Sequence, residues 1–233
     1  MTSSPRIIFQ DKDLLVLDKP AGWIVNRSQT TFRQETLQDW LEREMPCQVR
    51  FERAGIVHRL DKETSGLLLV AKNEKAFEEL QSQFKNRQVK KEYLVLLHGR
   101  VIPVEGSIQA AISRHPLNRH KFGVFLGGRS AQTEYQLVTF FPSSQWGSFS
   151  LVKVQPRSGR THQIRVHFKH LGFAVVGDLL YAGRKVARQD RRWCPRQFLH
   201  AAALEFRHPR SRQPLFFTSP LPEVLQRALN NVK

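Results

Sequence analysis

The segment Gly55–Asn73 contains the residue types from which an enzyme can build a carboxylate nucleophile, since it reads GIVHRLDKETSGLLLVAKN. Two apolar runs flank a polar turn, in which Asp61 follows Arg59. An aspartate in a turn ordinarily accepts hydrogen bonds from nearby backbone N–H groups, and for this segment alone that interpretation is the better one. A carboxylate beside a cation at the end of a buried sheet is also suited to act as an ionised nucleophile on a polyanionic substrate.

The net charge of the chain indicates the class of substrate. There are 37 Lys and Arg against 20 Asp and Glu, which gives a net charge of +17 and a pI of about 10.6. A basic surface can serve solubility alone, but a surplus of this size repels itself in the compact state. We therefore predict a nucleic-acid partner.

Two polar segments, Ser113–Lys121 and Ala182–Gln197, are dense in Arg, Lys and His. Solvated surface loops are the ordinary interpretation of such runs. The second segment, however, has only Asp190 to offset six cations, and it contains Trp193. The six are Arg184, Lys185, Arg188, Arg191, Arg192 and Arg196. Because cations beside an aromatic stacking surface are typical of RNA-contacting loops, we predict that this loop contacts RNA through Arg191 and Arg192, with Trp193 as a stacking surface.

Other chemistries lack their residue patterns. No GxxxxGK[ST] segment is present and no GxGxxG follows a strand, so no nucleotide cofactor is predicted. His162, His167 and His170 suggest a metal site, but on a strand His162 and His167 would face opposite sides. No cysteine pair or acidic ligand completes a tetrahedral set, so no metal is predicted. The remaining candidate roles of His162 are hydrogen bonding to phosphate or base and a purely structural role.

The cellular compartment follows from what the chain lacks. No apolar run approaches the ~20 residues of a membrane span, and no secretory signal is visible at the N-terminus. Cys47 and Cys194 are far apart, which favours reduced thiols over a disulfide framework. We predict a cytoplasmic protein.

Hydrophobic periodicity predicts the elements that position these residues. Helices are predicted at Glu35–Met45, Glu74–Asn86 and Leu221–Leu229. Strands are predicted at Arg6–Gln10, Leu14–Asp18, Ile56–Leu60, Leu67–Ala71, Glu92–Leu97, Ser107–Ser113, Thr133–Phe140, Phe149–Gln155, Gln163–Phe168 and Ala201–Phe206. Many strands and few helices, without regular βαβ alternation, indicate an α+β fold with a mostly antiparallel sheet in a single domain, 1–233.

Five ordered blocks resemble the RluA family of pseudouridine synthases. The turn matches the family motif HRLDxxTSG at every fixed position, and the resemblance extends from about Ile8 to Pro222. The other blocks are Asp13–Gly22, Val89–Gly99, Gly159–Asp178, and Phe198–Pro209 with Ser219–Pro222. The resemblance implies an isomerase that converts uridine to pseudouridine in RNA. It also implies the family's fold: a mixed sheet in two joined halves, flanked by helices and loops, with the catalytic cleft across the sheet.

The resemblance also assigns roles to residues. Asp61 is the implied nucleophile, Arg165 the cation that pairs with it, and Tyr93 the residue that meets the base. Arg59 resembles the residue that fills the space left by a flipped nucleotide, and unpaired loops lower the cost of flipping. The expected substrate is therefore a stem-loop of ribosomal or transfer RNA, bound by a monomer.

Some expectations concern substrate detail. Asn26 stands where the family commonly has His, and the small extra N-terminal RNA-binding domain of some relatives is not expected. Phosphate contacts are predicted for Lys19, Arg114, Lys121, Arg160 and His162. The alternative function is an RNA-binding or assembly factor without catalysis. A metal-dependent RNA hydrolase would need ligands that the sequence does not offer.

Overall fold

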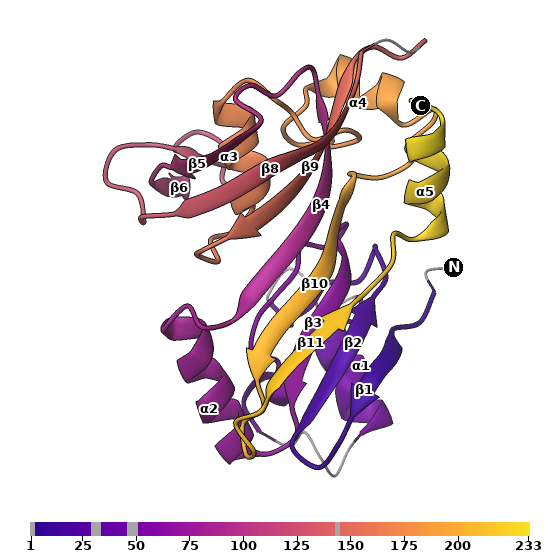
Figure 1. Cartoon of the computed structure of the whole chain (residues 1–233). Helices are drawn as coiled ribbons and strands as arrows, with labels where there is room; N and C mark the ends of the chain where they lie inside the picture. The colour runs from indigo at the N-terminus through magenta and orange to yellow at the C-terminus, as the bar shows by residue number, and fades with distance from the viewer. Residues whose placement is uncertain (1–2, 29–33, 46–50, 143–144) are drawn as a thin grey trace. The chain divides into compact units, whose positions relative to one another are not determined.

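A computed structural model of the chain describes residues 3–28, 34–45, 51–142 and 145–233 (Figure 1). The chain divides into two compact units. Unit 1 comprises Met1–Lys91 with Ala201–Ser219, and unit 2 comprises Glu92–His200 with Pro220–Lys233. Cys47 lies outside the described residues.

Unit 1 is built on a sheet with the strand order β1–β2–β3–β10, and β11 pairs with β10 (Figure 1). The strands are β1 (Arg6–Gln10), β2 (Leu14–Lys19), β3 (Ser65–Ala71), β10 (Leu199–Arg207) and β11 (Pro214–Thr218). Strand β3 is buried along its whole length, which explains its uninterrupted apolar sequence SGLLLVA. It forms antiparallel pairs with β2, so that Leu17 faces Leu68 in register.

Two helices and a 3₁₀ turn complete unit 1: α1 (Leu37–Glu44), α2 (Glu74–Lys85) and η1 (Glu52–Gly55). Helix α1 begins with a capping box in which Thr36 and Asp39 bond each other's backbone N–H groups. Asn73 caps α2 through its side-chain oxygen. Phe77 and Leu80 of α2 pack in one apolar cluster with Leu69 of β3.

Unit 2 has the strand order β4–β9–β8–β5 and a separate hairpin, β6–β7. The strands are β4 (Lys90–His98), β5 (Glu105–Gln109), β6 (Ile112–Arg114), β7 (Phe122–Val124), β8 (Gln132–Phe141) and β9 (Phe149–Pro156). The helices are α3 (Gln163–His170), α4 (Arg184–Asp190) and α5 (Glu223–Asn230). Helix α5 buries Leu225 and Leu229 in the same core cluster as Phe149 and Phe198.

The predicted α+β fold with mostly antiparallel pairing is confirmed. The pairs β1–β2, β2–β3, β10–β11, β4–β9, β8–β9, β5–β8 and β6–β7 are all antiparallel. The predicted helices match α1, α2 and α5 to within a few residues at each end. Within the described ranges, no helix is both long and apolar enough to cross a bilayer.

Four element predictions are wrong. Ile56–Leu60 forms no strand, and only Ile56 makes an isolated bridge, to Val70. The predicted strand Ser107–Ser113 is divided between β5 and β6, and β11 was not predicted. The basic segment Ala182–Gln197 contains a helix, α4, instead of being one continuous loop.

The fourth error concerns Gln163–Phe168, which is helical instead of extended. Ile164, Val166 and Phe168 alternate with polar residues, and this is the strand pattern. In the structure, all six residues of the segment are buried, the polar ones included. Burial of these polar residues with the apolar ones obscures the helical pattern in the sequence.

Candidate active site

The Asp61 loop lies in unit 1 and leads directly into β3. Asp61 is half-buried, and its backbone carbonyl accepts a hydrogen bond from Thr64 N at 3.0 Å, which closes a turn. Arg59, two residues earlier, is exposed. The turn that the sequence predicts around Asp61 is therefore present.

Glycines at the two ends of the loop allow the chain to approach its neighbours closely. Gly55 has φ +75°, and a Cβ there would lie 2.0 Å from the carbonyl oxygen of Ala71. Gly66 has φ +113°, and a Cβ there would lie 2.2 Å from the carbonyl oxygen of Ala201. Any larger residue would have to push the loop away from β3 or β10.

His58 attaches the loop to the side of β3. Its Nε2 accepts a hydrogen bond from the backbone N–H of Leu69 at 2.9 Å, and its ring stacks on Phe84 at 4.8 Å. Desolvation and the nearby Lys91 cation lower the pKa of His58 to about 3. The imidazole is therefore neutral at physiological pH, with its proton on Nδ1. Burial also lowers the pKa of Lys91, whose Nζ lies 5.9 Å from the Phe84 ring centre, to about 8.

Lys19 ties the loop to the chain that follows β2. Its side chain is completely buried, and Nζ donates to the carbonyl oxygens of Pro20, Trp23 and Lys62 at 2.9, 3.0 and 3.1 Å. Gly22 N also donates to Lys62 O at 2.8 Å. The prediction that Lys19 contacts phosphate is wrong, because its ammonium group is enclosed by carbonyls of unit 1. Its charge serves to hold two loops together.

Asn26 follows the same stretch of chain. Its Oδ1 is buried and has no hydrogen-bond partner among the described residues. The neighbouring carbonyls of Ile24 and Val25 accept hydrogen bonds from the backbone N–H groups of Leu37 and Gln38. The first turn of α1 therefore fixes the position of the chain just before Asn26.

In unit 2, Arg165 lies on α3 and is buried, with 7% of its surface exposed. Its Nε and one terminal nitrogen donate to the two carboxylate oxygens of Asp178, at 2.7 and 3.0 Å. The guanidinium also lies over the Tyr181 ring, 4.9 Å from its centre. The inward environment that the sequence predicts for Arg165 is confirmed. Its bidentate partner Asp178 was missed, although it lies in the block Gly159–Asp178.

Tyr181 extends this cluster to His162. The Tyr181 hydroxyl oxygen lies 2.8 Å from His162 Nδ1 and accepts from Phe122 N at 2.9 Å. A phenolic hydroxyl can accept from the Phe122 N–H and donate its own proton to Nδ1 at the same time. His162 adopts a left-handed conformation, with φ +57°, just before α3. It is therefore a structural partner of the Arg165 cluster in unit 2.

His167 also has a structural role. Its Nδ1 lies 2.8 Å from Thr133 Oγ1 and its Nε2 lies 3.1 Å from Ala110 O, so both ring nitrogens are engaged. Burial lowers the pKa of His167, and the hydrogen bond to the Ala110 carbonyl, which raises the pKa, offsets only part of this effect. A ring with both nitrogens bonded to protein groups has no position left for a metal ion.

The remaining candidate residues lie on other elements, and two of them, Arg114 and Lys121, are neighbours in the β6–β7 hairpin. Tyr93 is buried in β4 opposite Val154 of β9. Arg114 is exposed over the Phe122 ring, and half-buried Lys121 follows in the β6–β7 loop. Arg160 Nε donates to Ser130 O at 3.2 Å. The structure thus groups Arg165 and His162 through Asp178 and Tyr181, and it leaves Arg114, Lys121 and Arg160 near the surface.

The basic segment differs from its prediction in one important respect. Trp193 is buried, with 7% of its surface exposed, and packs against Phe149 at 5.2 Å. It therefore cannot be the exposed stacking surface that the sequence suggests. Arg191 donates to the carbonyls of Gly177 and Pro195, at 3.2 and 2.6 Å. Arg192, by contrast, is exposed.

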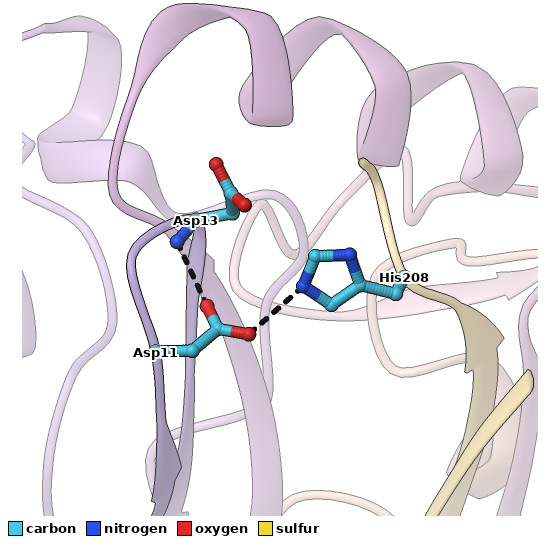
Figure 2. Close-up of side chains that lie close together, drawn as sticks. All are labelled: Asp11, Asp13 and His208. Atoms are coloured by element: carbon cyan, nitrogen blue, oxygen red, sulfur yellow. Dashed lines mark hydrogen bonds and ion pairs between the residues drawn. The ribbon is translucent and has the colours of Figure 1, made fainter. Parts of the chain in front are cut away.

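One group of potential metal ligands lies elsewhere in unit 1. Ligand atoms of Asp11, Asp13 and His208 all lie within 4.8 Å of one another (Figure 2). Asp11 accepts from His208 at 2.8 Å, and Asp13 accepts from Arg210 at 2.6 Å and from Asn73 at 2.9 Å. Burial alone would raise the pKa values of both carboxyl groups, but these hydrogen bonds and cations lower them. We interpret the group as an ion-pair cluster joining the β1–β2 turn to the β10–β11 hairpin.

Comparison with known proteins identifies the family. The model of a family described as RNA pseudouridylate synthase matches residues 13–170, which include Asp61, Tyr93 and Arg165. The chain belongs to this family. The resemblance to RluA-type pseudouridine synthases is thereby confirmed.

Several members of the RNA pseudouridylate synthase family are similar over most of this chain. An uncharacterized RNA pseudouridine synthase of Chloroflexus aurantiacus is 42% identical over 93% of the chain and 66% of its own length. A ribosomal large subunit pseudouridine synthase D of Nitrosomonas europaea is 38% identical over 98% of the chain and 65% of its own length. The chain thus spans about two thirds of the length of these relatives.

A solved structure of the family supports the fold. The human RNA pseudouridylate synthase domain containing 1 is 30% identical, with a TM-score of 0.74 over 94% of this chain and 84% of that one. The predicted pseudouridine synthase fold is therefore confirmed.

Proposed function

We propose that this chain isomerises a specific uridine to pseudouridine in a stem-loop of ribosomal or transfer RNA, with Asp61 as the nucleophile. The family match across residues 13–170 carries this proposal. Relatives named ribosomal large subunit pseudouridine synthase make ribosomal RNA the first substrate to test. The net charge of +17 fits a substrate of that kind.

The chemistry explains the residue types. The bond between the ribose and the uracil nitrogen must break, the base must rotate, and a new bond must form through carbon 5. A carboxylate can hold one fragment covalently during this exchange, and we assign this role to Asp61. Attack on the ribose, attack on the base and assistance to an elimination are all compatible with the assignment.

Arg165 and Tyr93 support the nucleophile in this proposal. A carboxylate enclosed with its substrate would have its pKa raised by desolvation, and a cation offsets that effect. We assign this task to Arg165, which Asp178 already holds in one orientation. Tyr93 provides a flat face for the base and a hydroxyl group close to carbon 5, where a proton must leave.

A uridine within a helix cannot reach such a site, so we propose that the nucleotide flips out of its stack. Flipping costs a few kcal/mol, and less where the base is already unpaired. Arg59 is exposed and precedes Asp61 by two residues, so its side chain is free to enter the space that the base leaves. A stem-loop target follows from the same cost.

The test is release of tritium from carbon 5 of uridine in total ribosomal and transfer RNA. Asp61→Asn is expected to abolish release while leaving RNA affinity within about threefold, because the amide keeps the shape but cannot act as a nucleophile. Asp18→Asn, which removes a carboxylate paired with Arg6 on β2, is the matched control and should remain active. Release by Asp61→Asn at the unaltered rate would refute the mechanism. No release by the unaltered protein would favour a non-catalytic RNA-binding factor.

A further inference from the structure

Unit 2 contains a pocket that the catalytic residues do not use. Its cavity volume is about 620 Å³, within the ~300–1,000 Å³ range typical of small-molecule sites. It lies between α5 and the segment after α4, and residues 145–146 line it as well. The residues that bear on its chemistry are Trp146, Trp193, Arg192, Arg227 and Glu223.

The two tryptophans give the pocket an aromatic wall. Trp146 and Trp193 stack with ring centres 6.1 Å apart and an interplanar angle of 25°. Trp193 is the buried member of the pair, whereas Trp146 is partly exposed. An aromatic ring at the edge of a pocket is a surface on which any nucleobase can stack.

Trp193 also brings a hydrogen-bond donor to this wall. Its indole Nε1–H is buried and has no hydrogen-bond partner among the described residues. Leaving such a donor unpaired costs about 1–3 kcal/mol. A ligand that offers an acceptor at this position would recover that free energy.

The charges of the pocket favour an anion. Two arginines and one glutamate line it, which leaves a net charge of +1. Arg227 donates to Glu223 at 3.1 Å, so this pair is internally compensated. The guanidinium of Arg192 makes no hydrogen bond or ion pair with the described residues and is exposed. The uncompensated charge at the pocket is therefore that of Arg192.

We propose that this pocket binds one unpaired nucleotide of the RNA substrate, with the base against Trp146 and the phosphate at Arg192. The inference rests on the proposed function only in taking the partner to be RNA. A protein segment would also fit an aromatic pocket, but α4, which ends just before Arg192 in the sequence, adds exposed Arg184, Lys185 and Arg188. Such a stretch of cations follows a phosphate backbone.

The direct test uses adenosine monophosphate as the probe and the indole N–H resonances of the full chain as the readout. The Trp193 resonance, assigned with Trp193→Phe, is expected to shift saturably at millimolar adenosine monophosphate. Arg192→Ala should abolish the shift, whereas Arg188→Ala, which removes an exposed arginine outside the pocket, should preserve it. Adenosine and inorganic phosphate, added separately, should each shift it less.

Two results would overturn the proposal. The first is a Trp193 resonance that stays in place, or one that phosphate alone moves as far as the nucleotide does. The second is an affinity for total ribosomal RNA that Arg192→Ala and Arg188→Ala reduce equally. The expected result is a loss of affinity of about tenfold for Arg192→Ala and a smaller loss for Arg188→Ala.

These outcomes are separable from those of the catalytic proposal. If Asp61→Asn retained activity, the assignment of Asp61 would fail while the Trp193 shift would stand. If the Trp193 shift were absent, the pocket proposal would fail while tritium release would be unaffected.

Discussion

The hydrogen bond from Leu69 to His58 makes the stability of unit 1 depend on pH. The folded protein keeps His58 neutral, with a pKa of about 3, whereas an unfolded chain has the ordinary value of 6.5. Below pH 6.5 the unfolded chain therefore binds a proton that the folded chain excludes, and stability falls as the pH is lowered toward 3. A pH of 5 is about 1.5 units below the pKa of the unfolded histidine. At about 1.36 kcal/mol per unit, the free energy of unfolding at pH 5 is therefore lowered by about 2 kcal/mol.

His58→Gln isolates this contribution. The glutamine side-chain oxygen can accept from Leu69 N–H but cannot be protonated in this range. The free energy of unfolding is measured with urea at pH 8 and at pH 5 for both proteins. Its decrease from pH 8 to pH 5 should be about 2 kcal/mol smaller in the variant than in the unaltered protein. Loss of the stacking on Phe84 should lower the stability of the variant at both pH values by about 1 kcal/mol.

The control is His120→Gln, at an exposed histidine of unit 2. Its pH dependence should match that of the unaltered protein. The protection factor of the Leu69 amide against hydrogen exchange, which corrects for the slower intrinsic exchange at low pH, reports the same bond locally. It should be smaller at pH 5 than at pH 8 in the unaltered protein and in His120→Gln, but not in His58→Gln. A His58→Gln variant that loses as much stability between pH 8 and pH 5 as the unaltered protein would refute the role of His58.

Three further substitutions test other contacts. Lys19→Met should destabilise the protein by about 2–4 kcal/mol in urea unfolding, because three carbonyls lose the hydrogen bond from the Lys19 ammonium group; a loss below about 1 kcal/mol would contradict this. Gly66→Ala should cost at least about 2 kcal/mol more than Gly127→Ala, which has a similarly positive φ but open space, and equal losses would argue against the close approach to Ala201. Asp178→Asn should lower both tritium release and the thermal midpoint, because it removes the carboxylate charge that holds the buried guanidinium of Arg165 in one orientation; unchanged values of both would refute its positioning role.

The sequence predicts those elements whose pattern of residues matches their local environment. Strands β2 and β3 are buried on both faces and read as continuous apolar runs, and α2 presents Phe77 and Leu80 at helical spacing on one face. The family motif around Asp61 can also be identified from the sequence, because it depends on residue order alone. These signals are local, so they need no knowledge of distant partners.

The errors arise where distant contacts decide the structure. Helix α3 buries polar residues, because Gln163 bonds Thr133 and Arg165 bonds Asp178. Lys19 resembles a surface cation until Lys62 and Trp23 enclose it. None of these partners can be identified from its spacing along the chain. The sequence does offer Asp178 as a partner for Arg165, because an acidic residue in the same block as a buried arginine indicates an ion pair.

The division of unit 1 into two stretches of sequence has a consequence for synthesis of the protein on the ribosome. The Asp61 loop is made early, but Gly66 packs against Ala201, and β10 exists only once the second stretch has been translated. The 109 residues between Lys91 and Ala201 take about 5–20 s to add at ~5–20 residues per second. During that interval β3 lacks one neighbouring strand, so the nascent chain carries an open β edge that chaperones or premature pairing can occupy. The nucleophile loop is therefore among the first segments to be made and among the last to acquire its final surroundings.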